Sequence, residues 1–149
     1  MRTVFVLNGP NLNLLGTREP DVYGHTTLAD VQQLCQAACD SAQLQLTFRQ
    51  SNHEGELVDW IHEAVRLHAE GKVAGLILNA GAYTHTSVAL HDALKALGAY
   101  KIELHISNTF AREAFRHHSY ISPAVDAVMA GLGVAGYGLA IQAVAQKSL

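Results

Sequence analysis

The sequence predicts an α/β fold in which a five-stranded parallel sheet lies between two layers of helices, a three-layer α/β/α arrangement. Short apolar runs typical of buried strands alternate along the chain with segments of helical periodicity. The run 73–78 is apolar at every position, as expected for a central strand covered on both faces. The 149 residues, 49% hydrophobic and 15% charged, suit a single domain with a substantial core.

Five segments are expected to be strands. The run 4–7 is continuously apolar like 73–78, whereas 44–48 and 100–107 alternate between apolar and polar residues. A shorter apolar segment at 125–129 supplies the fifth strand. Because strands joined by helices pair in parallel through right-handed crossovers, we expect a doubly wound, flavodoxin-like strand order.

A helix is expected to follow each strand. The first begins at Thr27, with Asp30 at the spacing of a capping box, and its apolar stripe includes Cys35 and Cys39. The second helix is expected after the loop 50–55, and the third after the segment 79–85, up to about Leu97. A short helix is expected from near Arg112, and a closing helix over 134–145.

The connection from Asn8 to Gly24 is the most informative segment, because it has no secondary-structure period. It is much longer than the usual strand-to-helix connection of about two to six residues, and long loops in compact domains are commonly functional. It carries three asparagines, Arg18 and Tyr23 at the sheet edge where α/β proteins bind ligands. We expect a lid that closes over a ligand, with Gly16 and Gly24 flanking Arg18 and Tyr23.

Alternation along the fourth strand places Glu103 and His105 on the same face. If helices cover both faces, these groups are buried side by side, and a carboxylate can then stabilise a charged imidazole. An exposed edge strand with an ordinary polar face would explain the same pattern.

Several other functions find no support in the sequence. The net charge of −3 argues against nucleic-acid binding, and no apolar run is long enough to span a membrane. Two cysteines four residues apart on an apolar helix stripe form no disulfide framework, which favours a reducing cytoplasm. His62 and Glu63 suggest a zinc helix, but residue 66, where the second ligand would stand, is arginine, and no metal site is expected.

The glycines of 131–136 match a dinucleotide-binding fingerprint, but too few residues follow them for a second strand and its acidic residue. We expect these glycines to allow close packing or a bend before the closing helix. On the third helix, Asp92 lies about 200° from Leu90 and points away from the core. It either faces solvent or reaches a neighbouring subunit.

The chain resembles the type II 3-dehydroquinate dehydratases, small flavodoxin-like enzymes of the shikimate pathway. The matching blocks follow the order of the family along almost the whole chain, at 8–16, 18–20, 23–24, 50–55, 79–87, 103–108, 111–119 and 131–137. The departures are Phe110, where the family frequently has histidine, and His91, where it frequently has arginine.

The resemblance implies a cytoplasmic enzyme that removes water from 3-dehydroquinate without a cofactor. Tyr23 would be the general base, Arg18 its partner, His105 the general acid, and Asn11 the residue that holds a water against the enolate. Substrate would contact Asn79, His85, Ile106, Ser107, Arg116 and, from an adjacent subunit of a dodecamer built of trimers, Asp92. Glu103 and Arg112 would support the site.

A tyrosine base must be physically reasonable. An unperturbed phenol has a pKa of about 10, so ionising it near pH 7 costs about 4 kcal/mol. A guanidinium about 4 Å away contributes a similar amount at an effective dielectric of about 20, which Arg18 and Arg112 could supply.

Lysine Schiff-base chemistry is disfavoured because the chain is too short for a TIM barrel. A flavodoxin-like module that binds a small ligand without catalysis is the alternative.

Overall fold

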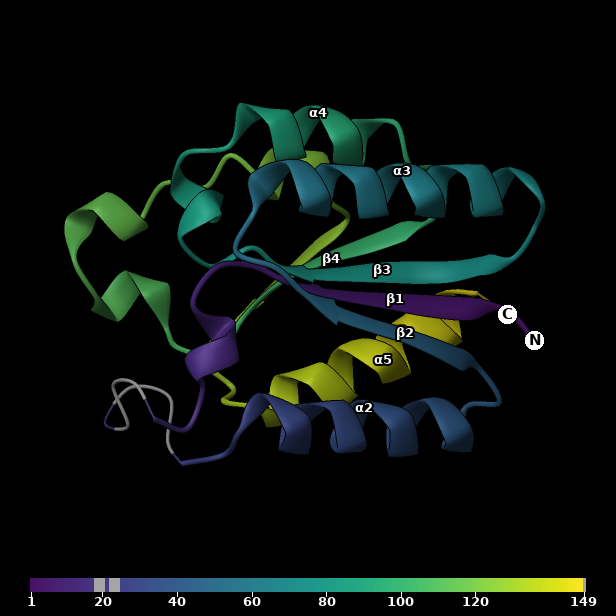
Figure 1. The fold of residues 1–149 in the computed structure, drawn as a ribbon, viewed down its shortest axis with the longest axis horizontal. Helices are drawn as coiled ribbons and strands as arrows, with labels where there is room; N and C mark the ends of the chain where they lie inside the picture. The colour runs from purple at the N-terminus through teal and green to yellow at the C-terminus, as the bar shows by residue number, and fades with distance from the viewer. Residues whose placement is uncertain (18–20, 22–24, 149) are drawn as a thin grey trace.

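A five-stranded parallel sheet runs through the computed structural model, which describes residues 1–17, 21 and 25–148 (Figure 1). Its strands are β1 (Thr3–Asn8), β2 (Gln45–Gln50), β3 (Val73–Asn79), β4 (Tyr100–His105) and β5 (Ala127–Ala130). Their spatial order is β2-β1-β3-β4-β5, so the direction of winding reverses beside β1. This is the doubly wound flavodoxin-like order, and the predicted fold class is confirmed.

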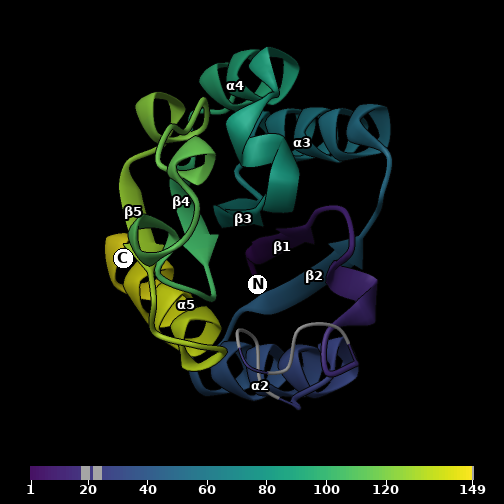
Figure 2. The same ribbon diagram turned by 90° about the vertical axis from the view of Figure 1, so that its left-hand side faces the viewer.

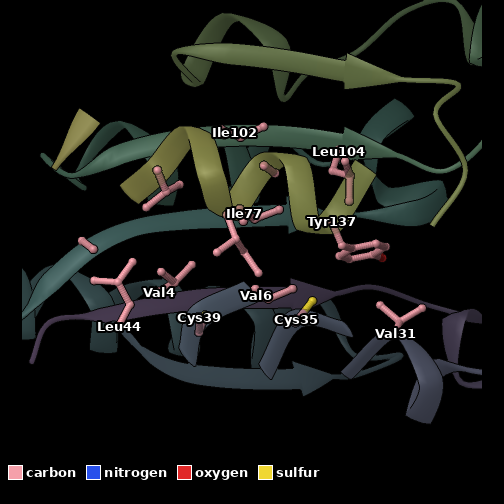
Figure 3. Close-up of a cluster of buried hydrophobic side chains, with 14 of the residues drawn as sticks. Val4, Val6, Val31, Cys35, Cys39, Leu44, Ile77, Ile102, Leu104 and Tyr137 are labelled. Carbon is pink, nitrogen blue, oxygen red and sulfur yellow. The ribbon is translucent and has the colours of Figure 1, made fainter. Parts of the chain in front are cut away.

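Helices cover both faces of the sheet, as Figure 1 shows. On one face lie α2 (Leu28–Ser41) and α5 (Ala135–Lys147), and on the other lie α3 (Glu54–Ala69) and α4 (Val88–Lys95). Each face has its own apolar core, because successive side chains of a strand point to opposite faces. Val4, Val6 and Ile77 pack against α2 and α5 (Figure 3), whereas Phe5, Leu7 and Leu76 pack toward α3 and α4.

The helix α2 begins as its sequence predicts. Thr27 Oγ1 accepts a hydrogen bond from the Asp30 backbone N–H, and Asp30 Oδ2 accepts one from the Thr27 N–H, which completes the capping box. Cys35 and Cys39 are fully buried in the core, as expected. Burial raises the pKa of the two thiols to about 12 and about 11 respectively, the neighbouring Cys39 and Asp40 adding to this effect.

Several predicted boundaries are wrong. β4 ends at His105 rather than at 107, because its partner β5 ends opposite it at Ala130. The helix expected from near Arg112 is replaced by two short 3-10 turns, η3 (Thr109–Ala111) and η4 (Ala114–Arg116). Arg112, between them, has an extended backbone that interrupts any helix.

The helix expected after His85 is α4, which begins at Val88 and ends at Lys95. Residues Gly81–His85 before it form a 3-10 turn, η2, so His85 does not share the face of α4 that carries Asp92. Two further 3-10 turns are η1 (Leu12–Leu14) and η5 (Ser122–Ala124). Figure 2 looks onto the carboxyl ends of the strands, where η1 to η4 gather.

The glycine-rich segment before α5 packs closely, as expected. Gly131 and Gly133 have positive φ, and their N–H groups donate to the carbonyls of His105 and Ile106 at 3.3 and 3.0 Å. A Cβ on Gly136 would lie 3.1 Å from Leu104. Within the described part of the chain, no helix has the length and apolar character needed to cross a membrane.

Candidate active site

A pocket opens at the carboxyl edge of the sheet, between the loops that follow β1, β3 and β4. It brings together most of the residues that the sequence singled out: Asn11, Asn79, His85, His105, Ile106, Ser107, Arg112 and Arg116 all line it. They come from segments distant in sequence, and they meet because parallel strands end at the same edge.

His105 and Glu103 form the buried pair that alternation on the strand suggested. β4 lies between β3 and β5, so the interpretation as an exposed edge strand is wrong. His105 Nε2 and Glu103 Oε2 are 2.5 Å apart, and the carboxylate is only 1% exposed. Glu103 thereby orients the imidazole through Nε2, and Nδ1 is the nitrogen left for a ligand in the pocket.

Two serines complete the surroundings of Glu103. Ser119 Oγ donates to its two oxygens at 3.2 and 3.0 Å, and Ser122 Oγ donates to Oε1 at 2.5 Å. Burial by itself would raise the pKa of Glu103, but the hydrogen bonds from His105, Ser122 and Ser119, together with the charge of His105, hold this pKa below its usual 4.5. The group beneath His105 is therefore a carboxylate at neutral pH.

Two histidines hold the segment that carries Ser119. His85 Nδ1 donates to the His118 carbonyl at 2.8 Å, and His91 Nδ1 donates to the Tyr120 carbonyl at 2.7 Å. A carbonyl can only accept, so Nδ1 of His85 carries a proton and Nε2 is the nitrogen that can meet a ligand. His91, one of the two departures from the family pattern, thus has a structural contact in this chain.

The arginines stand on η4 and just before it. Arg116 Nε donates to both carboxylate oxygens of Glu113 at 3.3 Å, and its guanidinium lies 4.9 Å from the ring centroid of Phe115. Arg112 Nε lies 3.8 Å from the same carboxylate. Phe110, the other departure, is exposed and lies 5.7 Å from the His117 ring, centroid to centroid. The two arginines give this wall of the pocket a positive charge suited to a carboxylate ligand.

Asn11 begins the η1 turn in the left-handed backbone region, with a φ of 69°. Its N–H donates to Asn52 Oδ1 at 3.0 Å, and Gln50 Nε2 donates to the same oxygen and to the Gly9 carbonyl, each at 3.1 Å. The loop after β2 therefore holds the start of the loop after β1.

Two predicted site residues cannot be placed in the pocket, and a third does not line it. Arg18 and Tyr23 lie outside the described residues, and so does part of the expected lid over 8–24. Asp92 is exposed on α4 and does not line the pocket of its own chain. Among the residues that the structure describes, no three His, Cys, Asp or Glu side chains gather as a metal site requires.

Three residues near the site were not predicted from the sequence: Ser119, Ser122 and Tyr137. Tyr137 lies buried between Asn8 and Asn79. The only signal for Tyr137 was its position at the end of a matching block. No sequence pattern predicts that the two serines contact Glu103, because these contacts depend on the path of the chain from η4 back to β4.

A model of the class II dehydroquinase family matches residues 2–145. The chain belongs to this family. It is 70% identical over 145 residues to the 3-dehydroquinate dehydratase of Acidovorax ebreus, covering 97% of this chain and 98% of that protein. It is 63% identical over 143 residues to the 3-dehydroquinate dehydratase 2 of Ralstonia nicotianae, covering 96% and 93%. The protein is therefore an enzyme, a hydro-lyase.

Solved structures agree with this assignment. The type II dehydroquinase from Propionibacterium acnes superposes with a TM-score of 0.91 at 40% identity, covering 98% of this chain and 97% of that one. A 3-dehydroquinate dehydratase-like protein from Bifidobacterium longum is more distant, with a TM-score of 0.71 at 30% identity and the same coverage.

Proposed function

We propose that the protein dehydrates 3-dehydroquinate to 3-dehydroshikimate by a tyrosine-base, histidine-acid elimination. The relatives that support this proposal are named 3-dehydroquinate dehydratases, and the chain matches them over almost their whole length. The observation that carries the mechanism is the pocket itself: His105, oriented by a buried carboxylate, faces the same pocket as Arg112 and Arg116. An acid and an anion-binding wall are what the elimination of water from a hydroxy-keto acid requires.

The reaction proceeds in two steps. Tyr23, ionised with the help of Arg18, takes a proton from the carbon next to the ketone, and the electron pair moves onto the carbonyl oxygen as an enolate. A water held by Asn11 stabilises that oxygen. The enolate then returns its electrons, the bond to the β-hydroxyl breaks, and the hydroxyl leaves as water with a proton from His105. No electrons are gained or lost, so the chemistry needs no redox cofactor.

Glu103 explains how His105 can act as an acid. The carboxylate accepts from Nε2 and stabilises the protonated imidazole, so the second proton, on Nδ1, can pass to the leaving hydroxyl. Ser119 and Ser122 keep the carboxylate charged, and the segment around them is held by His85 and His91. The positioning of the acid thus depends on the segment 118–122 and on its contacts with η2 and α4.

Substrate recognition is divided among the remaining residues. Arg116 suits the substrate carboxylate through its guanidinium fork, and Arg112 adds a second positive charge. Asn79, His85, Ile106 and Ser107 line the wall where the ring hydroxyls would lie. Asp92 belongs to an exposed helix face, and we place it in the site of a neighbouring subunit, within a dodecamer built of trimers.

The direct test is to add 3-dehydroquinate to the purified protein and follow the enone absorbance of 3-dehydroshikimate. Wild-type protein should turn substrate over, whereas Tyr23→Phe should lose about 10² to 10⁴-fold in kcat, as expected for a missing general base. Full activity of Tyr23→Phe would refute the base assignment alone. Binding of 3-dehydroquinate without turnover by the folded wild type would instead support the alternative, a binding module. A lysine adduct trapped by borohydride would overturn the mechanism.

A further inference from the structure

Three buried polar side chains meet behind the pocket, from three different elements. Asn8 and Asn79 are the last residues of β1 and β3 and are register partners. Tyr137 projects from α5 toward them, within the core cluster of Figure 3. Asn8 and Tyr137 are 0% exposed and Asn79 is 4% exposed, so their polar groups depend on one another rather than on bulk water.

The hydrogen bonds among them form one chain. Tyr137 Oη donates to Asn8 Oδ1 at 2.7 Å and accepts from Asn79 Nδ2 at 2.9 Å. Beyond Asn8, its Nδ2 donates to the Arg49 carbonyl at 3.1 Å. Beyond Asn79, its Oδ1 accepts from the Gly81 N–H at 3.3 Å.

The backbone groups at the two ends of this hydrogen-bond chain fix the orientation of both asparagine amides. A backbone carbonyl can only accept, so the nitrogen of the Asn8 amide must face Arg49 and its oxygen must face Tyr137. A backbone N–H can only donate, so the oxygen of the Asn79 amide must face Gly81 and its nitrogen must face Tyr137. The tyrosine hydroxyl fits between them because it accepts from one amide and donates to the other.

We propose that Tyr137 is a positioning residue for Asn79, the amide that lines the substrate pocket. This inference rests on the proposed function, in which Asn79 binds substrate. The hydrogen bonds to Gly81 and Tyr137 fix which side of the Asn79 amide carries the oxygen and which the nitrogen. One N–H and one oxygen lone pair of this amide are then left for a ligand, in a defined arrangement. Without the Tyr137 hydroxyl, the Asn79 amide loses the partner of its nitrogen and keeps only the contact with Gly81. Substrate binding then weakens, because the substrate itself must order the amide.

A tyrosine suits this place because burial raises its pKa, so the hydroxyl keeps its proton throughout the working pH range. Phenylalanine would fill the same space but leave Asn8 Oδ1 and Asn79 Nδ2 without their partner. The ring itself packs in the apolar cluster between α5 and the sheet and does not line the pocket.

The test is Tyr137→Phe, with Tyr100→Phe as the matched control. Tyr100 is half-buried at the start of β4, at the opposite end of the sheet. For folded Tyr137→Phe we expect KM for 3-dehydroquinate to rise about 3- to 10-fold, with kcat changed less than about twofold, and Tyr100→Phe to match wild type. A role in stability alone would lower the melting temperature and leave KM unchanged. That result would overturn the inference.

Asn8→Leu tests the same chain from its other side and serves if Tyr137→Phe does not fold. It keeps a branched side chain of similar shape but removes the acceptor that fixes the proton of the Tyr137 hydroxyl, so the hydroxyl no longer holds the Asn79 amide in one orientation. KM should again rise about 3- to 10-fold, and an unchanged KM would count against the proposal. Absence of turnover by the wild type would refute the proposed function, whereas an active wild type with unaffected variants would refute only the role of Tyr137.

Discussion

The hydrogen bond from Ser122 to Glu103 allows a quantitative test, because its strength should depend on pH. Replacing Ser122 by alanine removes one donor, 2.5 Å from Oε1, to a carboxylate that is 1% exposed. A hydrogen bond to a charged group contributes about 1.5–3 kcal/mol net. Ser119 still donates to both oxygens in the variant. We therefore expect the free energy of unfolding to fall by about 2 kcal/mol at pH 7.

The pH dependence follows from the direction of the pKa shift. Glu103 has a folded-state pKa below its usual 4.5, so its ionised contacts contribute stability above that value and lose it as the pH falls through the folded pKa. Without Ser122 the folded pKa of Glu103 is higher, so the variant takes up its proton first. The destabilisation should be complete at pH 7 and should shrink as the pH falls below 4.5.

The assay is urea unfolding at a constant protein concentration, at pH 7 and at steps below pH 4.5, for wild type and Ser122→Ala. The same substitution in a Glu103→Gln background closes a double-mutant cycle. There it should cost less than about 1 kcal/mol, because a neutral amide gains less from the hydroxyl than a carboxylate does. An equal cost at every pH, or in both backgrounds, would refute the reasoning and assign Ser122 a packing role only.

Two further predictions concern the pocket loops and the assembly. Gly9→Ala should lower the free energy of unfolding by about 1–3 kcal/mol and reduce activity, because its Cβ would lie 2.3 Å from the Ala80 carbonyl oxygen. Gly55→Ala is the control, because nothing lies within 4 Å of the added Cβ. In the same thermal and kinetic assays it should be neutral or stabilising. Asp92→Ala and Tyr23→Phe should each be strongly impaired alone, but co-assembled oligomers should regain activity, because mixed sites combine an intact Tyr23 with a neighbour's Asp92. A mixture no more active than its parents would show that Asp92 does not serve the adjacent site.

The sequence predicted the part of the site that depends on local geometry. The two-residue period of β4 placed Glu103 and His105 on one face, and the capping pattern located the start of α2 at Thr27. The edge that carries the site was also predictable, because the polar loops follow the apolar runs and parallel strands end at one edge. That reasoning brought the loops that carry Asn11, Asn79 and His105 to one edge, whereas Arg116 was placed in the site only by the resemblance to the family.

The predictions were weaker where the chain forms loops rather than periodic elements. The region around Arg112 was assigned to a helix, and the 3-10 turn η2 was not predicted. In both places the segment is short and its backbone is shaped by contacts with other loops, such as the Tyr120 N–H with the Thr84 carbonyl. Intrinsic propensity is a weak guide when tertiary contacts of this kind decide the backbone.

By itself, then, the sequence determined the doubly wound sheet, the edge that carries the site, and the placement of an acid and a histidine on one strand face, because periodicity and strand direction are local properties of the chain. Only the tertiary structure decided that β4 is an interior strand, which buries Glu103 and makes its pairing with His105 obligatory. It alone brought Ser122 to Glu103 across 19 residues and Tyr137 to Asn8 across 129. Such contacts join groups that have no common period, and they form because a buried polar group must find a partner wherever the fold places one.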